Sequence, residues 1–134
     1  TTTANGAVYG INLTFNGSSS SYSYHNLLGN GTSPAVSNGT SASYIYLYSS
    51  MVGATSSYVA AGIVDIIDYT STTKNKTIKH LTGTNTTGVD STPCINLGSG
   101  LWYATPAAVT SITLTPEIGT FASGSSFALY GIKG

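Results

Sequence analysis

The chain has 134 residues, only 6% of them charged, and its four lysines are balanced by three aspartates and one glutamate. Arginine is absent, so the clustered cations that displace counterions from nucleic acid or hold a protein on an anionic membrane are missing. The composition therefore argues against both kinds of partner, and the length fits a single domain over residues 1–134.

Residues 1–6 offer no core residue to anchor them and are expected to form a flexible arm. Beyond them, apolar residues recur at the two-residue period of strands. At 44–48, for example, tyrosines lie on one face and Ile45 and Leu47 on the other. Asn-Gly pairs, which close tight turns, separate such runs, and no stretch keeps helical spacing. We expect strands over about residues 7–15, 20–27, 43–50, 58–69, 76–82, 93–97, 100–104, 109–115 and 125–133.

Short strands separated by turns at this regular spacing predict an all-β fold, a single antiparallel β-sandwich of jelly-roll type with about eight strands. Residues 29–40 form the longest polar connection and are expected to be a loop. In the last predicted strand, 125–133, apolar residues occupy both faces: Phe127 and Leu129 on one, Tyr130 and Ile132 on the other. That pattern is typical of a strand covered on both sides.

Residues able to carry chemistry are few. Asp65 and Asp68 are the nearest approach to a paired carboxylate site, but side chains three residues apart on a strand leave opposite faces, and Asp68 begins a turn. The spacing of His25, His80, Asp90 and Cys94 matches no known zinc pattern. We therefore predict no catalytic residue, no metal ion and no cofactor.

The tyrosines form two rows on predicted strands. Such rows combine large apolar faces with hydroxyl groups, which suits a subunit interface, a glycan-binding surface or packing within the chain. These three interpretations remain open from the residues alone. The candidate interface or glycan-contact residues are Tyr22 and Tyr24 in the first row and Tyr44, Tyr46 and Tyr48 in the second.

Three blocks in the second half of the chain, residues 66–77, 100–112 and 121–133, resemble a β-sandwich module of structural proteins of tailed bacteriophages. The most specific block runs from Gly124-Ser125 to Leu129-Tyr130-Gly131-Ile132. The resemblance implies a virion component, such as a capsid decoration protein or a head or tail fibre, that is usually oligomeric and has no catalytic motif.

Four residues in these blocks have predicted structural roles. Trp102, after a turn at Gly98-Ser99-Gly100, supplies the largest core side chain. Gly124 allows a tight entry to the last strand, which carries Tyr130, and Gly131 leaves room there for a neighbouring backbone or ring.

We therefore expect a non-enzymatic virion structural protein that assembles with copies of itself, as a homotrimer by analogy, and decorates a phage capsid or other virion surface. Its partners would include other virion proteins such as the major capsid protein. The alternative is a carbohydrate- or receptor-binding domain of a tail fibre that recognises a host-surface glycan, and a third is a secreted adhesion module. A surface of hydroxyls rather than charges further predicts a melting temperature nearly constant between about pH 5 and 9.

Overall fold

A computed structural model describes residues 9–51, 59–84, 94–104 and 106–132. The described residues form eight strands and no helix, so the all-β expectation is confirmed, and no helix among them is long and apolar enough to span a membrane. The strands are β1 (Tyr9–Phe15), β2 (Tyr22–Gly29), β3 (Pro34–Ala42), β4 (Ile45–Met51), β5 (Ala60–Ile67), β6 (Lys76–Thr84), β7 (Cys94–Trp102) and β8 (Ile112–Pro116).

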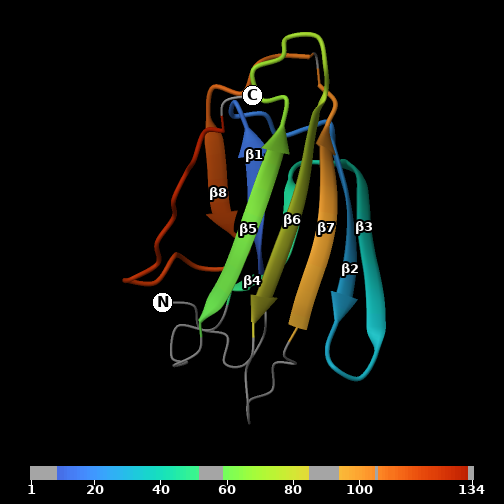
Figure 1. The fold of residues 1–134 in the computed structure, drawn as a ribbon, viewed down its shortest axis with the longest axis vertical. Coiled ribbons are helices and arrows are strands. Elements are labelled where there is room, and N and C mark those ends of the chain that lie inside the picture. Colours follow the sequence, from blue (N-terminus) through green and yellow to red (C-terminus); the bar gives the residue numbers. More distant parts are fainter. Residues whose placement is uncertain (1–8, 52–58, 85–93, 105, 133–134) are drawn as a thin grey trace.

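The strands form two antiparallel sheets that pack face to face, which confirms the β-sandwich (Figure 1). The small sheet has the order β4-β1-β8, and the large sheet has the order β3-β2-β7-β6-β5. The chain crosses between the sheets after β1, β3, β4 and β7, so residues far apart in sequence meet across the core.

The core lies between the sheets and is centred on three aromatic rings. Trp102 is 6% exposed, and its ring centroid lies 5.7 Å from that of Phe15 and 6.2 Å from that of Tyr22. Ile45 and Leu47 point into the same core, as their alternation with the tyrosines of 44–48 predicts. Trp102 is thus the large core side chain expected from the sequence.

One continuous strand, β7, replaces the two strands predicted at 93–97 and 100–104. The predicted turn at Gly98-Ser99-Gly100 was wrong, because both glycines face inward and other side chains fill the space beside them. A β-carbon on Gly100 would lie 2.6 Å from Ile45, and one on Gly98 would lie 2.2 Å from the Nε2 of His80. The glycines therefore mark close packing, of Gly100 against the opposite sheet and of Gly98 beneath side chains of the neighbouring strands, rather than a break in the strand.

Residues 29–40, predicted as a loop, contribute most of β3 instead. β3 pairs along β2 as the edge strand of the large sheet, with Val36 opposite Leu27. An edge strand is hydrogen-bonded on one side only and tolerates polar residues and an initial proline such as Pro34, so its sequence lacks the alternation that marks an inner strand.

The predicted C-terminal strand at 125–133 was also wrong, since residues 117–132 lie in no strand. Gly124 does turn the chain, with φ of 92° and the Ser125 N–H donating to the Ala122 carbonyl at 3.1 Å. The chain beyond it joins neither sheet. Tyr130 is 84% exposed, and no atom lies within 4 Å of a β-carbon built on Gly131, so Gly131 fills no crowded position. The predicted arm, 1–6, lies outside the described residues.

The packing against Gly98 yields a stability prediction. We expect Gly98→Ala to lower the free energy of unfolding by about 2 kcal/mol or more, because the added methyl overlaps the buried side chains of His80 and Asn26. Gly83→Ala in β6 is the matched control, since its β-carbon would meet only the Cys94 carbonyl oxygen, at 3.6 Å. Urea denaturation measures both. Equal stability of the two variants would mean that the core shifts to accept the methyl.

Candidate assembly surface

The two predicted tyrosine rows occupy different environments. Tyr22 is fully buried, its hydroxyl accepting the N–H of Phe15 at 2.8 Å and its ring lying against Trp102. It is a core residue and cannot reach a partner in the folded chain, so as a surface candidate it was wrong. Burial raises the pKa of the Tyr22 hydroxyl.

The other four candidates, Tyr24, Tyr44, Tyr46 and Tyr48, form what we call the tyrosine cluster. Tyr46 is at its centre, with ring centroids 6.2 Å from Tyr24, 6.3 Å from Tyr44 and 5.4 Å from Tyr48. All four side chains are partly buried. The rings therefore cover much of one another, which favours packing within the chain over an open binding platform.

Hydrogen bonds from Tyr46 tie together the three strands of the small sheet. Its hydroxyl donates to the Glu117 carboxylate just after β8, and the N–H of Gly10 in β1 lies 3.1 Å from both that hydroxyl and Oε2 of Glu117. Burial raises the pKa of the Tyr46 hydroxyl, and the hydrogen bond to Glu117 raises it further. The hydroxyl is therefore already engaged and has a structural role.

The acidic residues do not converge on one site. Asp65 pairs with Lys79 at 3.3 Å across β5 and β6, whereas Asp68 lies in the turn after β5 and pairs with Lys74 at 2.8 Å. The hydrogen bond from Lys74 lowers the pKa of Asp68. Asp68 has φ of 54°, and its carbonyl accepts the Ser71 N–H at 3.0 Å, as expected for a turn residue.

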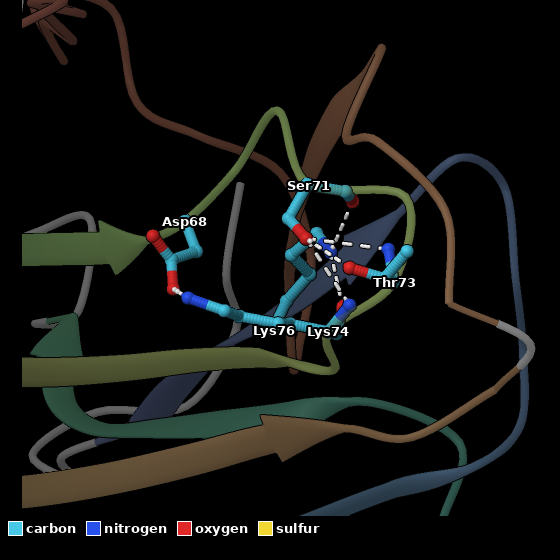
Figure 2. Close-up of polar contacts among 5 residues, drawn as sticks. All are labelled: Asp68, Ser71, Thr73, Lys74 and Lys76. Atoms are coloured by element: carbon cyan, nitrogen blue, oxygen red, sulfur yellow. Dashed lines mark hydrogen bonds and ion pairs between the residues drawn. The ribbon is translucent and has the colours of Figure 1, made fainter.

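A buried ammonium group organises the turn that follows β5. Lys76, at the start of β6, is fully buried, and its Nζ donates to the carbonyl oxygens of Ser71, at 2.7 Å, and Lys74 (Figure 2). Ser71 Oγ in turn accepts the N–H groups of Thr73 and Lys74 at 3.2 and 3.1 Å. The carbonyls replace the water that the charge loses, so this cation is a structural anchor.

The histidines and the cysteine lie apart. No group of three or more His, Cys, Asp or Glu side chains that could hold a metal ion occurs among the described residues, and Asp90 is outside them. His25 is exposed on the large sheet and Cys94 is partly buried, whereas His80 is 2% exposed between the sheets. Burial lowers the pKa of His80 to about 4, so its imidazole is neutral at pH 7.

A shallow depression opens at one end of the large sheet. No tyrosine, tryptophan or phenylalanine lines it within the described part of the chain, so it lacks the aromatic ring that a sugar-binding groove would offer. Its lining consists of Gly29, Asn30, Gly31, Gly83, Thr84, Cys94 and Ile95.

The most unusual surface is the outer face of the large sheet. The strand registers place one aliphatic residue from each of the five strands in a single line. We call this line the apolar row; its members and exposed fractions are Val36 (81%), Leu27 (53%), Leu97 (56%), Leu81 (44%) and Ile63 (62%). Ile95, 58% exposed, lies two residues from Leu97 on the same face. Neighbouring strands are about 4.8 Å apart, so the side chains form one continuous apolar surface.

The apolar row was not predicted from the sequence. Each member belongs to a different strand, and β2 and β5 each carry apolar residues on both faces, as at Leu27 and Leu28 or Ile63 and Val64. That double-sided pattern was a signal that the outer face is apolar too. Only the register, which pairs Leu97 with both Leu27 and Leu81, shows that these residues are neighbours.

The buried His80 predicts that stability depends on pH, contrary to the flat response expected from composition. Its folded pKa of about 4 lies below the unfolded value of 6.5, so its contribution is complete above pH 6.5 and is lost as the pH falls toward 4. The residues beside His80, namely Asn26, Val64 and Gly98, carry no charge. We expect the free energy of unfolding to fall by about 2 kcal/mol between pH 7 and 5.

Urea denaturation across this pH range measures the effect. In His80→Leu, the fall in the free energy of unfolding between pH 7 and 5 should largely disappear, whatever the variant's absolute stability. The exposed control His25→Gln should keep this fall. A wild-type profile parallel to that of His80→Leu would contradict the assignment.

The anchoring role of Lys76 is tested by Lys76→Met, which keeps the aliphatic length and removes the donors. We expect a loss of about 2 kcal/mol in the free energy of unfolding, since the carbonyl oxygens of Ser71 and Lys74 lose a charged donor in a partly buried site. Lys79→Met on the same strand breaks only an exposed ion pair and should change stability by about 0.5 kcal/mol or less. If chemical denaturation finds the Lys76 variant as stable as the wild type, desolvation of the ammonium offsets its hydrogen bonds.

Comparison of the chain with family models, with curated proteins and with solved structures finds no match. The candidate surface is therefore assigned on its own geometry.

Proposed function

We propose that this protein is a non-enzymatic structural protein that assembles with copies of itself on the surface of a phage virion. The observation that carries the assembly is the apolar row. Placement on a virion rests on the resemblance of residues 66–133 to phage structural modules, as do the homotrimer and the contact with a major capsid protein.

Exposed aliphatic side chains in line across a whole sheet are costly for a monomer in water. The row exposes an area on the order of a few hundred Å², the size at which an apolar patch on a soluble protein marks an interaction site. Burying it gains roughly 25 cal/mol for each Å² removed from water. Association of copies through this face therefore supplies a driving force that the monomer leaves unused.

The charges beside the row suit self-association. Asp65 and Lys79 lie on the same face and neutralise each other at 3.3 Å, and the whole chain has a formal net charge of zero. Two copies therefore meet without repulsion, and recognition depends on shape and apolar contact rather than on electrostatic steering.

The glycan-binding alternative has weaker support. Sugar recognition needs an accessible ring face beside polar groups in a groove. The tyrosine cluster is partly buried against itself, and the depression at the end of the large sheet has no aromatic lining among the described residues. A glycan array tests this alternative, and reproducible binding that Tyr44→Ala abolishes would replace assembly as the primary function.

Self-assembly through the row is tested by Leu97→Lys, which puts a charge at its centre. We expect the wild type to form oligomers in sedimentation velocity experiments and the variant to have an association constant reduced by about a hundredfold or more. Thr113→Lys, an exposed position on β8 in the other sheet, adds the same charge away from the row and should associate like the wild type. A wild type that stays monomeric at all concentrations, or variants that behave alike, would refute the proposal.

A further inference from the structure

The C-terminal segment, residues 125–132, is strongly apolar yet exposed. Phe127 is 58% exposed, Leu129 82%, Tyr130 84% and Ile132 88%. In Figure 1 it is the red stretch that runs back along the outside of the sandwich on the β8 side without joining a sheet. Exposure of four large side chains within six residues is rare on a monomer and indicates a missing partner.

The pattern of the segment specifies what kind of partner is missing. Phe127 and Leu129 fall on one face of an extended chain, and Tyr130 and Ile132 fall on the other. Such a pattern belongs to a strand that is covered on both faces. No strand lies beside the segment among the described residues, so its backbone groups have no ladder partners there. The sequence has the pattern of a strand for which the described sheets provide no position.

The segment starts from a fixed point. Phe121 packs against the core, and its ring centroid lies 4.9 Å from that of Phe127 in an edge-to-face contact. A turn at Gly124 joins these two rings, and the chain beyond it runs along the outside of the sandwich without joining a sheet (Figure 1). The segment is therefore held at the surface of its own sandwich.

Among the sheet edges, that of β5 fits an added strand best. β5 has eight residues, like the segment, and is bonded only to β6 in the described structure. Its inward residues Val64 and Ile66 are only partly buried, so an added strand would complete their cover. The other large-sheet edge, β3, is mostly polar and begins with a proline, while the small-sheet edges β4 and β8 have only seven and five residues. β5 thus offers a long, mostly apolar edge without a proline or a register shift, and its one charged residue, Asp65, is already paired with Lys79.

We propose that residues 125–132 of one copy add as a strand to the edge of β5 in a second copy of this chain. Main-chain hydrogen bonds along β5 hold the strand, and alternate side chains cover Val64 and Ile66 on one face and extend the apolar row beyond Ile63 on the other. The inference rests on the proposed self-assembly and names one of its contacts. It uses a surface distinct from the centre of the row, so the two are separable.

Amide hydrogen exchange of the full chain, at protein concentrations below and above association, tests the contact. On association we expect exchange of residues 127–132, and of the β5 amides that point away from β6, to slow by about tenfold or more. Protection of the segment already in the monomer would show pairing within the chain and overturn the proposal. Protection gained at another edge strand, β3, β4 or β8, instead of β5, or no protection of the segment at all, would overturn it as well.

Variants separate this contact from the row. Leu129→Lys places a charge in the segment, and Ala128→Pro removes a ladder donor. Each should weaken association about tenfold or more. Both sites are exposed, so the monomer should stay as stable as the wild type. Ser123→Lys, at an exposed turn position just before the segment, is the matched charge control and should have little effect. If Leu97→Lys abolishes assembly but the segment variants do not, the strand contact fails and the proposed function stands. If the wild type never associates, both fail.

Discussion

Two inward-facing glycines in the central strand β7 make room for the side chains that fill the core. Gly100 leaves the space that Ile45 of the opposite sheet fills, and Gly98 leaves the space for His80 and Asn26. A side chain at either position would push the sheets apart or displace a buried neighbour. The burial of Ile45 and of His80 depends on these two positions.

Close packing also buries two of the few ionisable side chains of this protein. His80 is held neutral by burial, and the buried Nζ of Lys76 donates to the backbone carbonyls of Ser71 and Lys74. The remaining acid–base pairs, Asp65 with Lys79 and Asp68 with Lys74, are exposed. With the surface near neutrality, apolar contact and neutral hydrogen bonds are what remain for binding a partner.

The apolar row and the C-terminal segment have one feature in common. In each, large apolar residues of the kind that normally fill a protein core lie exposed in the single chain. Ordinary surface leucines are scattered, whereas here Leu27, Leu97 and Leu81 are aligned by register and Leu129 belongs to a two-faced apolar run. Alignment, more than exposure itself, is what supports an assembled rather than a solitary state.

By itself, the sequence determined the fold class, the strand character of most of the chain, the core position of Trp102 and the turn at Asp68, because period, turn residues and side-chain size act locally. It misassigned 29–40, split β7 at its glycines and gave 125–133 a place in the sheets, because pairing partners are not local. It also ranked Tyr22 with the surface tyrosines, although its hydroxyl bonds to the backbone of β1. Only the tertiary structure decided that Leu97 faces solvent and that Val36 and Ile63 lie in line with it. The reason is that strand register brings together residues that share no sequence pattern.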